Sequence, residues 1–240
     1  FPSISGGWVP TQYDWYRNLL PFNNFLKFRA SWGRVGNDRL KDENGNDIRF
    51  PYLTTLGNVS STWGTGLAEN RTGSMNLKWE VSTKTNFGID ARFFDDKVDM
   101  TVDFFHTKTT DIFQRRANIP DEGGLSNVLP YANIGSMKSW GMDGTLAYTH
   151  TFNKDMALTV RGNFTHAENE VIYWEQSGVN YPYQSNSGVP YKVQRGLIAL
   201  GLFKDEEDIK SSPKQTFMDN YRPGDIKYKD VNGDGKIDQD

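Results

Sequence analysis

Alternation of apolar and polar residues with a period of two is the feature of this sequence that most restricts its fold. In residues 26–32 (LKFRASW) the polar side chains of Lys27, Arg29 and Ser31 alternate with apolar ones. The same pattern recurs in residues 87–93, 98–104 and 156–164, and more weakly in 144–149. Because successive side chains of a strand point to opposite faces, the pattern predicts two-faced β-strands and an all-β fold.

The connections between these segments are of two kinds. Residues 94–97 and 152–155 are short and rich in Asp and Asn, as in tight hairpin turns. The others, residues 35–78, 107–137 and 167 onward, are long and rich in Gly, Asn, Ser and Pro. Short turns that alternate with long loops are typical of outer-membrane β-barrels and are uncommon in compact soluble domains.

Full charges lie in mid-strand on the face opposite the apolar one, and the polar lumen of a wide barrel suits them. These polar-face residues are Lys27, Arg29, Asp90, Arg92, Asp99, Asp103, Arg161 and Asn163. Aromatic residues flank the apolar faces, as in the girdles at bilayer interfaces. They are Trp79, Phe93, Phe94, Phe104, Phe105, Trp140, Tyr148 and Phe152.

A soluble all-β module remains an alternative, because strand patterns alone do not separate it from a barrel. Such a carbohydrate-binding or adhesion module would bury its apolar face in a closed core. A barrel would turn the same face toward lipid. The residues that distinguish the two arrangements are Leu26, Phe28, Val102 and Leu158.

Composition narrows the class of protein further. The 240 residues include 14% aromatic and 24% charged residues, which is typical of an ordered chain, and no cysteine, which excludes disulfides and thiolate metal sites. The formal net charge of −3 does not indicate a nucleic-acid partner. The chain begins without a methionine and ends inside a motif, so we expect it to be a piece of a longer protein.

The motif at the end, YKDVNGDGKID (residues 228–238), has the spacing of a calcium-binding loop. Asp230, Asn232 and Asp234 stand at positions 1, 3 and 5, the Lys236 carbonyl at 7, and Asp238 at 9. No amphipathic helix precedes the loop; a polar segment at 204–210 suggests only a short helix. The loop either holds a structural Ca²⁺ or is a turn whose side chains cap their own backbone.

Aromatic residues in the long loops form a candidate ligand surface, since flat rings beside Asn and Gln suit sugars or peptides. They are Trp63, Tyr173, Trp174, Tyr181, Tyr183 and Tyr191. The alternative is that these rings pack the loops together. No G-x-S-x-G, H-E-x-x-H or P-loop pattern occurs, so we expect no enzyme activity.

Five stretches, in order along the chain, resemble segments of the SusC/RagA-like TonB-dependent receptors of Bacteroidetes. They are FPSISGGW (1–8), FLKFRASWGRVGND (25–38), NLKWEVSTKTNFGIDARFFDDKVDMTVDFFHTKTTDIF (76–113), YANIGSMKSWGMDGTLAYTH (131–150) and RPGDIKYKDVNGDGKID (222–238). The resemblance therefore covers most of the chain.

The resemblance implies that residues 1–240 are part of one transmembrane β-barrel domain of about 22 antiparallel strands with long extracellular loops. The plug, the signal sequence and the final strands would be absent, and residues 168–240 would be mostly a long outer loop. The implied function is import of oligosaccharides or peptides across the outer membrane of a Gram-negative bacterium of the Bacteroidetes type. The implied partners are TonB, through the missing N-terminal part, a SusD-like surface lipoprotein, the ligand and outer-membrane lipid.

Overall fold

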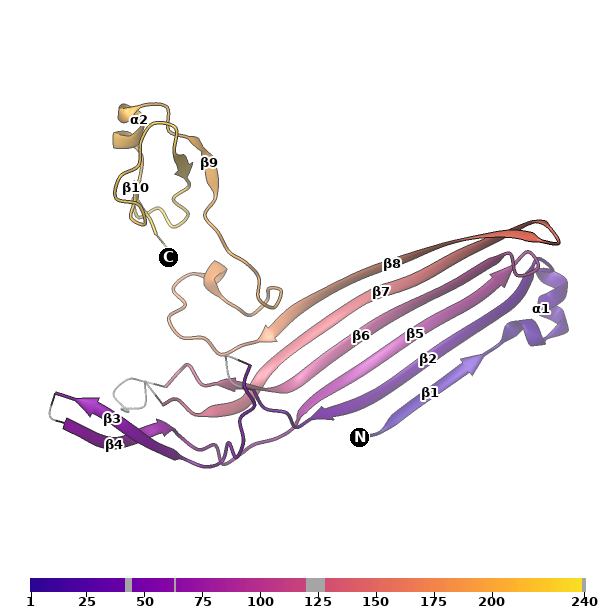
Figure 1. The fold of residues 1–240 in the computed structure, drawn as a ribbon, viewed down its shortest axis with the longest axis horizontal. Helices are drawn as coiled ribbons and strands as arrows, with labels where there is room; N and C mark the ends of the chain where they lie inside the picture. Colours follow the sequence, from indigo (N-terminus) through magenta and orange to yellow (C-terminus); the bar gives the residue numbers. More distant parts are fainter. Residues whose placement is uncertain (42–44, 63, 120–127, 239–240) are drawn as a thin grey trace. The chain divides into compact units, whose positions relative to one another are not determined.

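The structure, a computed structural model, describes residues 1–41, 45–62, 64–119 and 128–238 (Figure 1). The chain forms two compact units. The first comprises Phe1–Ser177 and Asn186–Tyr191, and the second comprises Gly178–Ser185 and Lys192–Asp240. No helix in the described part of the chain has the length and apolar character needed to cross a bilayer.

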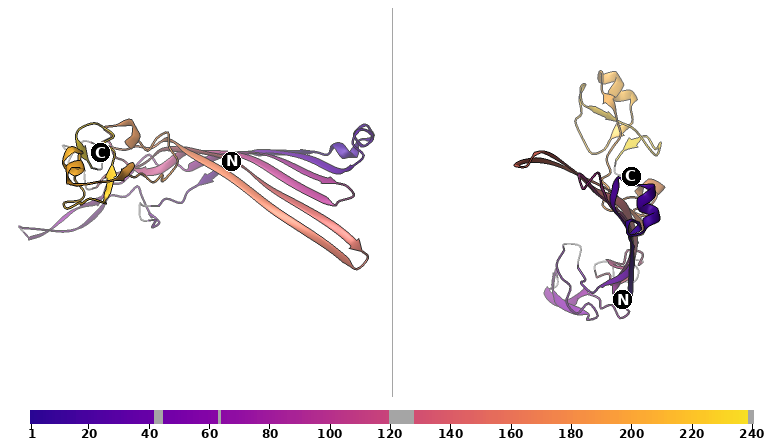
Figure 2. Two further views of the ribbon diagram at one scale, coloured as in Figure 1. Left: turned by 90° about the horizontal axis from the view of Figure 1, so that it is seen from above. Right: turned by 90° about the vertical axis from the view of Figure 1, so that its right-hand side faces the viewer.

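The first unit is built on a six-stranded sheet in the order β1-β2-β5-β6-β7-β8, with every neighbouring pair antiparallel. Its strands are β1 Ser3–Trp8, β2 Asn23–Asn37, β5 Glu80–Phe93, β6 Val98–Arg115, β7 Tyr131–Asn153 and β8 Met156–Tyr173. Figure 2 shows that these strands form one curved layer. A separate hairpin, β3 Thr55–Ser61 with β4 Gly64–Arg71, lies in the connection between β2 and β5.

All of the predicted strands lie within observed strands, which confirms the all-β assignment. The loop predicted at residues 107–137 is wrong in extent, because β6 continues to Arg115 and β7 begins at Tyr131. The residues added to β6 begin with Thr107-Lys108-Thr109-Thr110-Asp111, which show no apolar alternation, so the hydrophobic pattern stops while backbone pairing continues. The predicted long loop after β2 contains the β3–β4 hairpin, whose short Gly-rich strands carry little alternation.

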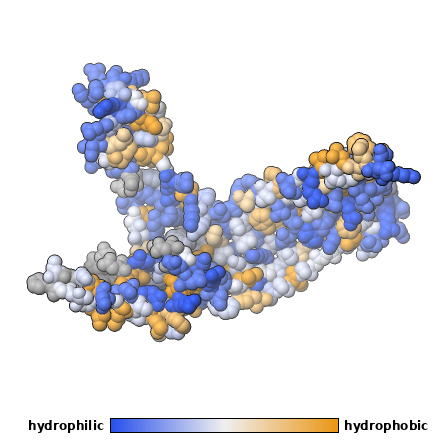
Figure 3. Space-filling view, in the orientation of Figure 1, coloured by the Kyte–Doolittle hydropathy of each residue, from blue (hydrophilic) through white to orange (hydrophobic). Residues whose placement is uncertain are grey.

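Strand register places most of the large apolar residues of the six strands on one face, here called the apolar face. Its members are Ile4, Trp8, Leu26, Phe28, Ala30, Trp32, Phe87, Ile89, Ala91, Phe93, Val98, Met100, Val102, Phe104, Trp140, Met142, Leu146, Tyr148, Leu158, Val160 and Phe164. Alongside the band, the charged residues lie on the opposite, polar face: Lys27, Arg29, Asp90, Arg92, Asp99, Asp103, Asp143 and Arg161. Figure 3 shows one side of the molecule, where hydrophilic residues cover much of the middle of the sheet.

The apolar face is a band that crosses the hydrogen-bonded rows of the sheet obliquely. Phe164, the last member of the band along β8, pairs with Gly144, and that row continues across the sheet to Trp8. On β8, Phe164 is the band residue nearest the long connections, whereas on β1, Trp8 is the band residue nearest the short turns. Strands of a membrane barrel tilt by about 35–45°, so a band of constant height must cross their rows in this way.

The apolar face is exposed along the sheet. Leu158 is 53% exposed and Phe164 is 55% exposed, and no second sheet covers the band among the residues that the structure describes. A soluble sandwich would require these side chains to lie in a closed core. The observed exposure does not fit the soluble-module alternative, and the sheet is open, as expected for part of a larger barrel.

The polar face carries an ion cluster that joins three strands. Arg29 on β2 donates to both carboxylate oxygens of Asp90 on β5, at 2.8 and 3.0 Å, and to Asp103 on β6, at 2.9 Å. To reach Asp103, the guanidinium passes over Gly88, where an added Cβ would lie 2.7 Å from Arg29 Cζ. Glycine at position 88 is therefore a requirement of the cluster.

The end of the sheet that carries the short turns is closed by compact connections. A 3₁₀ turn, η1 Pro10–Gln12, and a short helix, α1 Asp14–Leu19, connect β1 to β2. Tyr16 of this helix is buried and accepts a hydrogen bond from Asn23 at 3.0 Å. The turn between β5 and β6 has three successive residues with positive φ, at Phe94, Asp95 and Asp96, two of them the Asp type that tolerates this conformation.

The second unit is small and has its own core. It contains the 3₁₀ turn η3 Pro182–Gln184, the helix α2 Glu206–Ser211, and the short strands β9 Ala199–Leu202, β10 Lys214–Gln215, β11 Ile226–Tyr228 and β12 Lys236–Ile237. Strands β9 and β11 pair antiparallel, and β10 and β12 pair parallel. Phe203 is buried and stacks on Tyr221. The predicted short helix is confirmed, with Asp205 as its N-cap.

Candidate functional site

The best-formed candidate site lies at the end of the sheet that carries the long connections. After β8 the chain turns, and residues 186–191 run back beside the strand. Val171 exchanges backbone hydrogen bonds with Val189 and Gly188, at 2.9 and 2.7 Å, and Asn169 accepts from the Tyr191 N–H at 2.7 Å. The positive φ of Gly188 permits this turn.

This return brings two of the predicted ligand residues together. The rings of Trp174 and Tyr191 lie 5.8 Å apart, tilted by 50°. Trp174 also lines a hollow of about 320 Å³, with Arg115, Arg116, Gln176 and Asn186 among the other lining residues. An aromatic surface beside guanidinium and amide groups has the composition of a site for a hydroxyl-rich or amide-rich ligand.

An ion pair with a buried carboxylate lines this hollow. The Glu175 side chain is only 3% exposed and accepts from Arg116 Nε at 2.7 and 3.1 Å. It also accepts from the backbone N–H of Asn118 at 2.9 Å, and the Glu175 carbonyl accepts from the buried Gln114 amide at 3.4 Å. The carboxylate is thus occupied in joining the end of β6 to the end of β8, which makes Glu175 a positioning residue.

Sequence reasoning did not identify Glu175 or Arg116, because the two residues are 59 positions apart. The available signal is one acidic residue directly after two aromatic ones, in the segment Tyr173-Trp174-Glu175. A carboxylate beside large apolar side chains predicts burial with a cationic partner. It does not predict which cation.

The other predicted aromatic residues lie elsewhere. Tyr181 and Tyr183, in the second unit, stack on each other with centroids 5.3 Å apart and planes within 3° of parallel. Tyr173 is the exposed last residue of β8. Trp63 lies outside the described residues. The assignment of these six residues to one ligand surface stays a prediction.

The calcium-like loop is shaped by hydrogen bonds from its own backbone. Asp230 accepts from the N–H groups of Gly233 and Gly235, at 2.6 and 2.9 Å, and Asp234 accepts from Lys236 N at 2.9 Å. Asn232 accepts from Asp234 N at 3.2 Å. No cluster of three or more metal-binding side chains occurs within residues 1–41, 45–62, 64–119 and 128–238. Bound Ca²⁺, with ligands from Asp230 to Asp238, stays a prediction.

One ion pair in the second unit lies close to this loop in sequence. Lys227 on β11 donates to Asp208 of α2 at 2.7 Å, and its ammonium lies 5.9 Å from the centre of the Phe203 ring. The Lys227 ammonium, with a smaller contribution from the backbone N–H of Lys204, holds the pKa of Asp208 below its usual range. The pair therefore fixes α2 against the β9–β11 strands while Asp208 is ionised.

Comparison with known proteins identifies a family of similar chains. A family described as "TonB dependent receptor-like, beta-barrel" matches residues 1–230. The TonB-dependent receptor P39 of Formosa agariphila is 29% identical over 99% of this chain and 25% of its own length. The TonB-dependent receptor SusC of Bacteroides thetaiotaomicron is 24% identical over 99% of this chain and 24% of its own length.

Solved structures show the same fold. The RagAB peptide importer in its open-open state superposes with a TM-score of 0.66 at 22% identity, over 88% of this chain and 22% of that chain. Its closed-closed state gives a TM-score of 0.63 at 23% identity, with the same coverage of both chains. The present chain spans about a quarter of the length of the curated relatives that it matches.

Proposed function

We propose, from the premise that the chain belongs to the TonB-dependent receptor-like β-barrel family, that it supplies wall strands and outer loops to an importer of large nutrients. The chain is of the SusC/RagA-like type, and receptors of this type lie in the outer membrane. The nutrient in this proposal is an oligosaccharide or a peptide. The observation that carries the proposal is the exposed apolar band, which crosses the hydrogen-bonded rows of the sheet obliquely, as in a barrel with tilted strands.

The proposed orientation follows from the two faces and the two kinds of connection. The apolar face meets lipid hydrocarbon, and the polar face lines a wet lumen. On β7 the apolar set runs from Trp140 to Tyr148, close to the span of about 9–11 residues that a tilted strand needs. The short turns lie on the periplasmic side, and the long connections, with the Trp174 hollow, lie outside the cell.

In this mechanism the outer loops and the lumen capture the ligand, and energy from TonB, delivered through a plug domain, releases it inward. The chain does no bond chemistry. Trp174 offers a ring face to the ligand with Tyr191 packed against it, Gln176 and Asn186 line the hollow, and the Arg116–Glu175 pair keeps the hollow in shape. RagAB is a peptide importer, which supports a peptide ligand by analogy, and the family resemblance supports a SusD-like surface lipoprotein as partner.

Ligand binding by the complete transporter tests this proposal. Trp174→Ala removes one ring face of the hollow, and a stacking contact contributes about 1 kcal/mol, so affinity should fall about fivefold. The measurement is calorimetric titration of the purified transporter with two probes, a mixture of neutral oligosaccharides and a peptide digest. The probe that binds identifies the nutrient class.

Trp79→Ala is the matched control, because Trp79 is an exposed aromatic residue that stacks on Phe1 and does not line the hollow. It should leave affinity unchanged. Equal loss in the Trp79 and Trp174 variants would contradict the assignment of the hollow. Binding of neither probe by a transporter that runs as a heat-modifiable, folded barrel would contradict the proposed function itself.

A further inference from the structure

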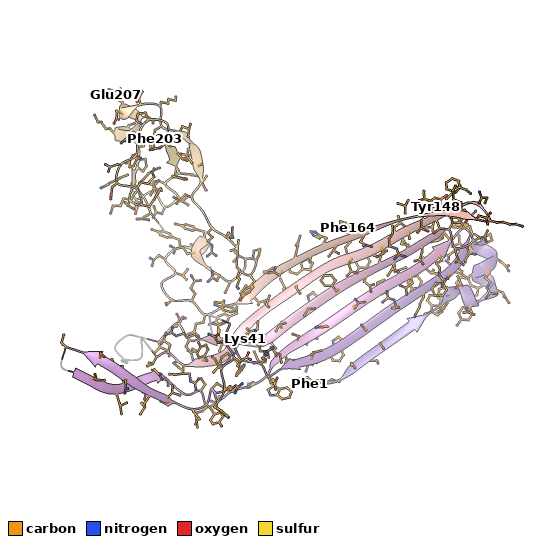
Figure 4. The ribbon with its side chains drawn as sticks, viewed as in Figure 1. Phe1, Lys41, Tyr148, Phe164, Phe203 and Glu207 are labelled. Carbon is orange, nitrogen blue, oxygen red and sulfur yellow. The ribbon has the colours of Figure 1, made fainter. Side chains whose placement is uncertain are left out.

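The apolar face contains a hollow of about 390 Å³ between β6, β7 and β8. Its walls are the side chains of Met100, Val102, Met142, Leu146 and Phe164. All five belong to the apolar face by strand register, so the hollow opens on the same side as the lipid-facing band. Figure 4 labels Phe164 part-way along β8, with Tyr148 nearer the short-turn end of β7.

Two glycines on neighbouring strands create the hollow. Gly144 on β7 pairs with Phe164, and Gly162 on β8 pairs with Leu146. The two glycines are thus diagonal neighbours on the apolar face, each beside a large side chain of the other strand. A Cβ added at Gly162 would have no atom within 4 Å, so no protein group fills the space above it.

Asp143, Thr145 and Asn163 also border the hollow, but strand register places their side chains on the polar face. The side chains that face the hollow are therefore apolar and offer no group that could orient a polar ligand. Apolar cavities bind hydrocarbon rather than water, because water there would lose its hydrogen bonds. The hollow lies within the band, with Gly144 midway between Trp140 and Tyr148 along β7, at the depth of the hydrocarbon core. Methionine side chains are flexible and adapt to irregular hydrocarbon shapes.

We infer that one acyl chain of an outer-membrane lipid binds in this hollow, between Met100 and Val102 on one side and Phe164 on the other. The hollow is continuous with the lipid-facing band, so the occupant reaches it from the bilayer without crossing a polar surface. An acyl chain restores the dispersion contacts that the two missing side chains leave unmade. Lipid bound here is held more tightly than lipid elsewhere on the band.

Native mass spectrometry of the complete transporter, loaded with dioleoyl phosphatidylethanolamine, tests this inference. Gly162→Leu fills the hollow with protein and should lose one retained lipid per chain relative to the wild type. Ala30→Leu is the control, because Ala30 is also exposed on the band, on β2, but does not line the hollow. It should retain as many lipids as the wild type, and heat-modifiable migration verifies that both variants fold.

Equal lipid retention by the Gly162→Leu variant and the wild type would overturn the inference, and so would loss of one lipid from both variants.

A second copy of the barrel is the competing occupant. This chain has no cysteine. In a complete transporter whose other cysteines, if any, are replaced by serine, a Gly162→Cys variant reports this occupant directly by disulfide crosslinking in the membrane. Efficient crosslinking between two copies would assign the hollow to a protein interface. Lipid retention is measured without any nutrient, so its failure leaves the importer proposal intact.

Discussion

Replacement of Arg29 by methionine should weaken the barrel wall, because it leaves the carboxylates of Asp90 and Asp103 without their cation. Arg29 makes three charge-assisted hydrogen bonds, at 2.8, 3.0 and 2.9 Å. The neighbour of Asp103 on β7 is Asp143, so the variant also places two acidic residues directly opposite each other without compensation.

The magnitude follows from the exposure of the cluster. A hydrogen bond to a charged group contributes about 1.5–3 kcal/mol when it is shielded, and an exposed ion pair contributes about 0–1 kcal/mol. The Arg29, Asp90 and Asp103 side chains are 34%, 26% and 16% exposed, which is between these limits. We therefore expect the free energy of unfolding to fall by about 1–3 kcal/mol in the Arg29→Met variant.

The assay is urea unfolding of the complete transporter in lipid vesicles, followed by tryptophan fluorescence. Lys84→Met is the matched control, because Lys84 is on the same polar face and makes no ion pair within the described residues. Adding Asp103→Asn to Arg29→Met should recover part of the loss, because it removes one orphaned charge. Equal destabilisation by Arg29→Met and Lys84→Met, or no recovery in the double variant, would refute the reasoning.

Four further outcomes are expected. Glu175→Gln should cost the loop after β8 about 2 kcal/mol of local stability, seen as faster amide exchange in residues 174–191 while exchange in the sheet is unchanged. Gly141→Val should prevent close pairing of β7 with β8, since an added Cβ would lie 2.2 Å from the nearest carbonyl oxygen, and heat-modifiable migration should be lost. Lys227→Met should raise the pKa of Asp208 toward its usual value. In the wild type, the ion pair stabilises the folded unit fully above the usual pKa of an aspartate, and this stabilisation is lost as the pH falls through the lowered pKa of Asp208. Wild type and variant should therefore differ in the rate of proteolysis of residues 192–240 near neutral pH and should converge in strong acid. If the loop holds Ca²⁺, adding calcium should slow that proteolysis, and Asp230→Asn should abolish the effect; equal protection of the variant would exclude the loop as the site.

Local patterns in the sequence were sufficient to predict the five long strands of the sheet. Alternation around Phe28 and Val102 predicted strands with an apolar and a charged face, and Asp-rich turns marked the hairpins at 94–97 and 152–155. These features depend on residues adjacent in the chain, since successive side chains of a strand point to alternate faces of the sheet. The ends of β6 and β7 near the long connections were not predicted, because no apolar alternation marks them.

Only the tertiary structure determined the register of the sheet, that is, which residues of neighbouring strands pair with each other. A slip of one residue in a strand would exchange its two faces, so the oblique band of the apolar face exists only in the observed register. The same register places Arg29 beside Asp103, 74 residues later. The return of the chain after β8 places Trp174 beside Tyr191. Two-faced strands follow from the sequence alone, whereas partners distant along the chain meet only when backbone pairing across the sheet brings them together.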